Sequence, residues 1–467
     1  MKAASFLLLL FALPAFADQP AQSTVSFALE AIRDRALIPY KVETIAVAGL
    51  RGLSTLDPAL DVGLAHHRLQ LRYRGHAVGG FGAPPEEDVA GWTLLIEQAA
   101  REAARHSTAI AKADADQLTE AVVDGFLTRL DIFSHYAGPA EARERRASRS
   151  GFGGIGIRYD IEHDFITVTE VIPDSPAAAA KLKIGDRIAA IDDAPLAGLE
   201  QNDIVVKLRG PIASPIKLAL RRDGSAPTIT LHRALIVTPT VTSRSEDGIG
   251  VITLSGFNEN SAASVRDAVR KLKAVTDFKG LVLDLRGNLG GLLDQGVTIA
   301  DLFIEHGRIL ATAGRHPAAA QSQDAHPGDP GESVPLVVLI DGHTASAAEI
   351  LASDLQDSGR AVLVGTNSFG KGAIQTVLEL PNHGEMTLTW SRFFTPSGYA
   401  LHGLGLLPNI CTAAETKPPS GDAKLAGGRA AATPMFQAWH NVAPDDMADR
   451  SRLRSHCPAG HEFRQEP

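Results

Sequence analysis

The sequence predicts a multidomain α+β protein with a helical N-terminal region, a mainly β module and an α/β domain. Three observations support this fold class. Apolar residues recur at helical spacing over 25–38 and 118–130. Short β-like runs alternate with glycine, proline and aspartate turns between 151 and 231. From residue 250 onward, apolar strands alternate with helices, which is typical of a mostly parallel sheet.

Regular elements are expected at definite ranges in the last two parts. The β module should contain strands at 155–159, 165–171, 187–191, 216–221 and 228–231. The α/β domain should contain strands at 251–254, 281–285, 336–340 and 361–364, and helices at 261–275, 293–305 and 347–357. The remaining segments suggest a loop at 74–87, a solvated charged linker at 141–149, and a loosely attached or disordered tail after 409.

Length and composition fit this organisation and exclude several classes of protein. The chain has 467 residues, which predicts roughly three domains at about 150 residues each. Its 44% hydrophobic and 21% charged residues are typical of a globular protein. A formal net charge of −9 argues against a nucleic-acid partner, and two cysteines exclude a disulfide scaffold or a multi-cysteine metal site.

The first residues have the pattern of a secretory signal peptide. Lys2 precedes an apolar run at 6–13, and small residues at 15 and 17 form a cleavage pattern. The run is shorter than the about 20 apolar residues that a membrane span needs. We therefore expect export without a membrane span, to the periplasm if the source is Gram-negative; an uncleaved anchor or a buried helix is the alternative. In that compartment Cys411 and Cys457 either form a disulfide or stay as free thiols.

Ser346 lies where a predicted strand ends and a predicted helix begins. In open α/β sheets, ligands bind beyond the carboxyl ends of the strands. A helix N-terminus also offers free N–H groups and partial positive charge to a developing oxyanion. The spacing of Ser346 and Glu349 equally fits a capping box, in which the serine caps the helix without any catalysis. On this fragment alone, capping is the simpler interpretation.

Two glycine-rich turns carry further candidate residues. Gly290 and Gly291 follow a predicted strand, where glycines allow close backbone approach and expose N–H groups. The sequence neighbours of Lys371 are mostly apolar residues and glycines. A lysine buried among such residues has a lowered pKa and can act as a general base. Gln375 lies four residues further on and shares a face with Lys371. An exposed surface lysine is the alternative.

Other chemistries fit the sequence less well. The string 365–371 resembles a phosphate-binding loop, but Gly372 stands where a serine or threonine would bind Mg²⁺. A Ser-His hydrolase would use His343, His383 or His402, and none of these lies in a recognisable catalytic motif. No cluster has metal-ligand spacing, so neither a metal nor another cofactor is expected.

Taken in order, the motifs resemble the carboxyl-terminal processing peptidases, the tail-specific proteases of the S41 serine peptidase family, over about 130–409. The motifs lie at 130–136, 153–157, 174–192, 208–211, 284–291, 369–375 and 394–398. The resemblance implies a PDZ-like domain at 150–237 and a ClpP/crotonase-like peptidase domain at 238–411. The other parts would be a signal peptide at 1–17, a helical N-terminal region at 18–149 and a C-terminal extension at 412–467.

The resemblance also assigns catalytic roles. Ser346 would be the nucleophile, Lys371 its general base, and Gln375 the residue that orients the lysine. The oxyanion hole would consist of the N–H groups of Ala347 and of the Gly290–Gly291 turn.

One departure concerns that turn. Leu289 stands where the family has proline, which could loosen the glycine turn.

The resemblance gives the β module a role in substrate choice. A PDZ domain takes an extended peptide as an added strand and holds its terminal carboxylate in a nest of backbone N–H groups. That nest would be Gly154, Ile155, Gly156 and Ile157. Arg209 would contact the peptidase domain and couple tail binding to activity, or else is an ordinary surface arginine.

The expected function is a secreted serine endopeptidase that cleaves exported proteins near their C-termini through an acyl-enzyme. Its partners would be polypeptides with free C-termini; a homo-oligomer or an adaptor protein stays open, and nucleic acid is not expected. Two rivals remain. One is a catalytically inactive peptide-binding scaffold or holdase, which the Leu289 departure favours, and the other is the Ser-His hydrolase.

Overall fold

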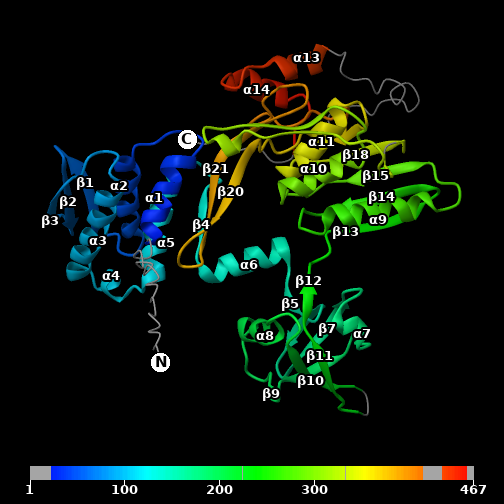
Figure 1. Cartoon of the computed structure of the whole chain (residues 1–467), viewed down its shortest axis with the longest axis horizontal. Helices are drawn as coiled ribbons and strands as arrows, with labels where there is room; N and C mark the ends of the chain where they lie inside the picture. The colour runs from blue at the N-terminus through cyan, green and yellow to red at the C-terminus, as the bar shows by residue number, and fades with distance from the viewer. Residues whose placement is uncertain (1–22, 223–224, 332, 414–433, 460–467) are drawn as a thin grey trace, which may run out of the picture.

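Three groups of elements make up the protein, a computed structural model that describes residues 23–222, 225–331, 333–413 and 434–459. The N-terminal helices lie on one side, the β module below, and the α/β domain with the last two helices on the other side (Figure 1). The predicted signal peptide at 1–17 lies outside the described residues. Within the described ranges, no helix has the length and apolar character needed to cross a membrane.

The N-terminal group is helical, as predicted, and also contains a small sheet. Its helices are α1 (Thr24–Arg35), α2 (Val42–Gly52), the short η1 (Leu53–Thr55), α3 (Val89–His106), α4 (Thr108–Lys112) and α5 (Ala115–Leu127). Its strands are β1 (Leu60–Ala65), β2 (Arg68–Tyr73) and β3 (His76–Gly82), which form an antiparallel meander. The loop predicted at 74–87 is therefore wrong over β3, because pairing with β2 and packing of Val78 and Phe81 outweigh the glycines there.

The β module has the predicted strands close to their expected ranges. Its elements are β5 (Phe152–Gly154), β6 (Ile157–Glu162), β7 (Phe165–Val171), α7 (Pro176–Ala179), β8 (Arg187–Ile191), β9 (Ala194–Pro195), α8 (Gln201–Leu208), β10 (Pro215–Arg221), β11 (Thr228–His232) and β12 (Ala234–Ile236). The main sheet has the order β11-β10-β8-β7-β6, so β6 is an edge strand. Strands β5 and β12, where the chain enters and leaves the module, pair with each other as a separate two-stranded ribbon.

The α/β domain contains the predicted, mostly parallel sheet. Its elements are β13 (Val241–Glu246), β14 (Ile249–Leu254), α9 (Ser261–Lys273), β15 (Gly280–Asp284), α10 (Leu293–Asp301), β18 (Leu336–Ile340), α11 (Ala347–Asp357), β19 (Val362–Gly365) and β22 (Ile410–Cys411). The sheet order is β13-β14-β15-β18-β19-β22, and every neighbouring pair except β13–β14 is parallel. The turn after β18 leads directly into Ser346 and α11.

A second sheet joins this domain to the N-terminal group. It consists of β16 (Arg308–Ala313), β17 (Ser322–Asp324), β20 (Ala373–Glu379) and β21 (Glu385–Phe394), with the short η2 (Pro317–Ala319) between β16 and β17. Strand β4 (His135–Ala137) pairs with the start of β21. Figure 1 shows β20 and β21 as a long hairpin between the two groups. Because β20 begins at Ala373, the sheet holds the backbone just beyond Lys371.

The tail after 409 differs from its prediction where it is described. Helices α13 (Pro434–Asn441) and α14 (Met447–Arg454) pack on the α/β domain, and Trp439 and Leu453 are buried in its core. A disulfide joins Cys411 to Cys457, which settles the pairing that the sequence left open. The expectation of a loose extension is therefore wrong for 434–459; 414–433 lie outside the described residues.

Candidate active site

Ser346 occupies a strained turn between β18 and α11. Its backbone has φ 57° and ψ −122°, a region that L-residues rarely adopt and that costs about 1–3 kcal/mol. Its N–H donates to a carboxylate oxygen of Glu349 at 2.9 Å, and the Glu349 N–H donates to the Ser346 carbonyl at 2.8 Å. The turn thus presents the serine at the carboxyl end of the parallel sheet and at the start of a helix.

Glu349 is fully buried and does more than cap this helix. One carboxylate oxygen accepts hydrogen bonds from the Ser346 N–H and, at 2.8 Å, from the Lys371 N–H. The other accepts the Gly370 N–H at 2.7 Å and the Ser368 hydroxyl at 2.5 Å. Burial raises the pKa of Glu349, and these donors oppose that shift. One side chain therefore holds the backbones of both predicted catalytic residues.

Lys371 lies in a half-buried setting next to an aromatic ring. Burial lowers the pKa of Lys371, while the charges of Glu349 and Asp131 oppose the shift. Its ammonium lies 5.0 Å from the centroid of the Phe133 ring. Among the described residues, no hydrogen bond joins Lys371 Nζ to Ser346 Oγ, so the structure brings their backbones together and leaves the lysine head beside Phe133.

Gln375 belongs to β20 and is held by its own sheet. Its Nε2 donates to Thr389 Oγ1 at 3.1 Å and to the Ala373 carbonyl at 3.2 Å. The structure therefore places Gln375 on the strand that follows Lys371, with its amide engaged across the β20–β21 pair.

The glycine turn lies against the start of α11. A Cβ added to Gly290 would lie 2.8 Å from Ser346 Cβ and 3.1 Å from Ala347 N, so only glycine fits there. The Gly290 N–H donates to the buried Asn288 side chain at 2.9 Å, whereas the Gly291 N–H donates to no acceptor within the described ranges. Leu289 is 69% exposed, so its side chain points away from the packed turn.

The three candidate histidines are separate from the serine. His343 is exposed in the turn before Ser346, and His383 is exposed beside Glu379. Burial lowers the pKa of His402 to about 4, and its ring packs edge-on against Phe133. In the described part of the chain, no hydrogen bond joins any of them to Ser346.

The four predicted peptide-binding residues line one hollow of the β module. The hollow has a volume of about 150 Å³ and lies between edge strand β6 and helix α8. Its lining consists of Phe152, Gly154, Ile155, Gly156, Ile157, Tyr159, Val205, Leu208 and Arg209. An unpaired strand edge beside an apolar helix face is the arrangement that receives an added peptide strand.

Arg209 lies at the mouth of this hollow and contacts helix α6 (Pro139–Ser150). Its guanidinium donates to Glu144 at 2.6 Å and stacks over the Phe152 ring at 4.1 Å. The described partner of Arg209 is thus the helix between β4 and the β module, rather than a residue of the α/β domain.

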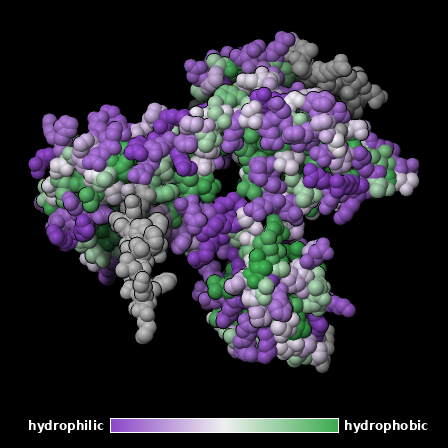
Figure 2. Space-filling view, in the orientation of Figure 1, coloured by the Kyte–Doolittle hydropathy of each residue, from purple (hydrophilic) through white to green (hydrophobic). Residues whose placement is uncertain are grey.

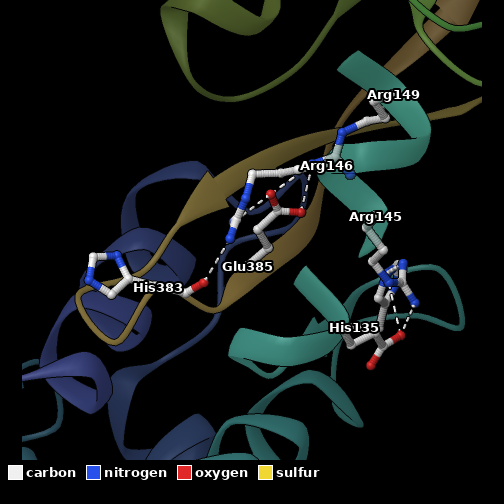
Figure 3. Close-up of polar contacts among 7 residues, drawn as sticks. His135, Arg145, Arg146, Arg149, His383 and Glu385 are labelled. Carbon is white, nitrogen blue, oxygen red and sulfur yellow. Dashed lines mark hydrogen bonds and ion pairs between the residues drawn. The ribbon is translucent and has the colours of Figure 1, made fainter. Parts of the chain in front are cut away.

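Helix α6 replaces the solvated linker expected at 141–149, and that expectation is wrong. Arg146 and Arg149 both bind the Glu385 carboxylate, at 3.0 and 2.7 Å, and that carboxylate is only 4% exposed (Figure 3). Arg145 donates to His135 Nε2. Figure 2 shows hydrophilic side chains gathered over this helix, between the three groups. The charges are therefore paired across elements that the sequence separates widely.

The substitution Glu385→Gln is expected to loosen α6 without disturbing the catalytic turns. Gln lacks the charge that binds both arginines, and a partner removed from a buried ion pair leaves the other charges uncompensated. Hydrogen exchange followed by mass spectrometry should show faster exchange over 139–150. Glu141→Gln is the matched control, because Glu141 is exposed and pairs with Arg145 on the same helix. Equal exchange in both variants would contradict the role given to Glu385.

The class of the protein follows from its matches to known families. Residues 248–412 match peptidase family S41, and residues 144–221 match the PDZ domain. The chain is therefore a peptidase that carries a PDZ domain.

Its relatives indicate which members of the peptidase family the chain is similar to in sequence. It is 40% identical over 303 residues to a carboxy-terminal-processing protease of Bartonella bacilliformis, covering 64% of this chain and 70% of that protein. It is 32% identical over 303 residues to the carboxy-terminal processing protease CtpA of Bacillus subtilis, covering 64% and 65%. The solved structure of a photosystem II D1 C-terminal processing protease aligns over 87% of this chain and 99% of its own, with 24% identity and a TM-score of 0.41. The chain belongs to peptidase family S41, among the carboxy-terminal processing proteases.

Sequence reasoning missed three contributors to the site. The sequence indicates Glu349 only as a capping residue, through its spacing from Ser346. The contact of Lys371 with Phe133 and the Glu385 ion pairs had no local signal, because their partners lie far apart in the sequence. In the described ranges, no group of three or more His, Cys, Asp or Glu side chains could hold a metal ion.

Proposed function

We propose that the protein is an exported serine endopeptidase that cleaves polypeptides near their C-termini through a Ser346–Lys371 mechanism. The observation that carries the proposal is the buried Glu349 carboxylate, which binds the N–H groups of both residues. A serine at a strained strand-to-helix turn and a lysine with a lowered pKa are the two groups that such chemistry requires.

The proposed reaction runs in two halves. Ser346 Oγ attacks the carbonyl carbon of the scissile bond, while the neutral amine of Lys371 takes the hydroxyl proton. The N–H groups of Ala347 and the Gly290–Gly291 turn stabilise the oxyanion. Lys371 then gives the proton to the leaving amine, and a water molecule hydrolyses the ester by the reverse sequence.

The geometry adds one requirement to this mechanism. Since Lys371 Nζ lies beside the Phe133 ring and makes no described hydrogen bond to Ser346 Oγ, the lysine amine must come within hydrogen-bond reach of the serine before the proton moves. Of the two turn glycines, Gly291 is the one whose N–H the described residues leave available, because Gly290 is bound to Asn288. Gln375 would orient the Lys371 amine through a hydrogen bond, after the bond from its own amide to Thr389 breaks.

Substrate choice is proposed to lie in the PDZ domain. A C-terminal peptide would pair with the free edge of β6. Its carboxylate would accept hydrogen bonds from the N–H groups of Gly154, Ile155, Gly156 and Ile157. Arg209 lies at the mouth of this hollow and binds Glu144, so peptide binding there would be coupled to helix α6 through this ion pair. The polypeptides cleaved would thus be those with a free, apolar C-terminus.

The test compares one unstructured peptide with a free carboxylate and the same peptide with an amidated end. Mass spectrometry should show internal cleavage of the free peptide by the wild type and only a small residual rate by Ser346→Ala. The amidated peptide should be cut with a higher KM, because its end lacks the charge that the nest binds. Binding without cleavage by the wild type would leave the scaffold function instead; the exposed side chain of Leu289 gives that rival no structural support.

A further inference from the structure

The C-terminal helix α14 contacts the turn that carries Lys371. Asn367 donates its side-chain N–H to the Arg454 carbonyl at 2.7 Å and its backbone N–H to the Cys457 carbonyl at 3.2 Å. Asn367 is fully buried. Glu349 holds the same turn further along, at Gly370 and Lys371. The turn is therefore fixed at one end by α14 and at the other by α11.

The guanidinium of Arg454 joins this turn to a second one. It donates to the Ser368 carbonyl at 3.2 Å and to the Leu404 carbonyl at 2.6 Å. A Cβ added to Gly405 would lie 2.9 Å from the same guanidinium, so the contact is close-packed. The Gly403 N–H donates to the Gly370 carbonyl at 2.8 Å. Arg454 thus bridges the turn that carries Lys371 and the turn at 403–405.

The disulfide keeps α14 in this position. Cys411 ends β22, which pairs with β19 at Gly365, and Cys457 follows the end of α14. The Cys457 sulfur lies 3.7 Å from the Gly365 carbonyl, and Cys457 is 1% exposed. A cross-link between residues 46 apart removes much of the entropy cost of docking this segment.

We propose that Arg454, held by the Cys411–Cys457 disulfide, is a positioning element for the catalytic base, and that reducing the disulfide slows catalysis. The inference rests on the proposed role of Lys371. It acts through the turn at 367–371, so it concerns the placement of the amine and leaves peptide binding by the PDZ domain unchanged.

Arg454→Met and Arg452→Met form the matched pair that tests this. Methionine keeps the apolar stem of the side chain and removes the donors. Arg452 lies on the same helix, is 63% exposed and pairs only with Asp449 among the described residues. Arg454→Met should lower kcat by about tenfold or more, because small misplacements of a catalytic group are costly. Its KM should stay within about twofold of the wild-type value, and Arg452→Met should match the wild type.

The pH profile separates positioning from general loss of structure. Water admitted beside Lys371 would raise the pKa of the lysine toward its ordinary value. The increase of kcat/KM with pH should therefore occur at a higher pH in Arg454→Met than in the wild type. The titratable groups that face Lys371 are Glu349 on α11, Asp131 and His135 before α6, and His402 beside the turn at 403–405. None of these is changed in the variant, so a shift reports the surroundings of the lysine.

The second arm reduces the disulfide of the full chain. Dithiothreitol supplies two electrons and two protons, which give two thiols and oxidised dithiothreitol, and alkylation counts the thiols by mass. The rate should fall with the appearance of two thiols and return on reoxidation. Should the reduced chain unfold, as circular dichroism would show, the Arg454→Met comparison decides alone.

The outcomes distinguish this inference from the proposed function. Full activity in Lys371→Ala would overturn the proposed dyad, and the inference with it. Activity that needs Ser346 and Lys371, but is unchanged by both Arg454→Met and reduction, would overturn the inference and leave the proposed function intact.

Discussion

Lys371→Met is expected to lower kcat by about a thousandfold, the usual contribution of a general base. Methionine fills the space over Phe133 without an amine, so the fold and KM should change little. Because a nucleophile and its base act as one unit, Ser346→Ala and the double variant should fall to the same residual rate. The measurement is steady-state cleavage of a fluorogenic peptide with a free C-terminus.

His343→Ala and Asp131→Asn complete this experiment. His343 is exposed and unconnected to Ser346 by any described hydrogen bond, so its removal should leave kcat unchanged; a loss equal to that of Lys371→Met would support the Ser-His rival. The Asp131 charge raises the pKa of Lys371 against the larger effect of burial. Removing that charge lowers the lysine pKa further, so the amine is neutral at lower pH. The rise of kcat/KM should then move to lower pH in Asp131→Asn.

Glu349→Gln is expected to cause the second-largest effect, on stability and activity together. A glutamine amide places an NH₂ group where one oxygen accepts two donors, so at least two buried donors lose their acceptor. Each such loss costs about 1–3 kcal/mol. Since the variant also releases Ser346 from Lys371, kcat should fall about a hundredfold. Denaturant unfolding followed by tryptophan fluorescence, and peptide cleavage, measure the two effects.

Ser353→Ala provides the control for this substitution. Ser353 is buried on the same helix, and among the described residues its hydroxyl donates only to the Ile350 carbonyl of that helix. Its removal should leave kcat at the wild-type value and change stability slightly. If Glu349→Gln behaved like Ser353→Ala, the carboxylate would be a helix cap without influence on the dyad.

Local patterns made much of the α/β domain predictable. Strand β18 and helix α11 lie at the ranges expected from an apolar run, a small-residue turn and a capping residue. The alternation of strands and helices predicted the parallel sheet, and short apolar runs between glycine, proline and aspartate turns predicted β7 and β8 of the PDZ domain. These signals lie within about ten residues of the element that they predict.

The contacts that assemble the site depend on residues far apart in the sequence. The partners of Glu349 lie 3 to 22 residues away, and Arg146 reaches Glu385 across 239 residues. The charged residues at 141–149 predict a solvated linker, because no local pattern shows that Arg146 and Arg149 bind a carboxylate more than 200 residues away. Likewise, the proline and glycine content of the tail predicts a loose extension. The contacts of Trp439 and Arg454 with the α/β domain have no local signal in the sequence.

The paired ribbon of β5 and β12 carries both backbone connections of the PDZ domain. The chain enters and leaves that domain along two adjacent strands, and Leu235 on the ribbon is 53% exposed. Because these two strands pair with each other, the domain is attached along one narrow connection. If the PDZ domain binds a substrate's C-terminus as proposed, a rotation of the domain about these two strands would change the distance from its hollow to Ser346, and with it the length of the fragment removed.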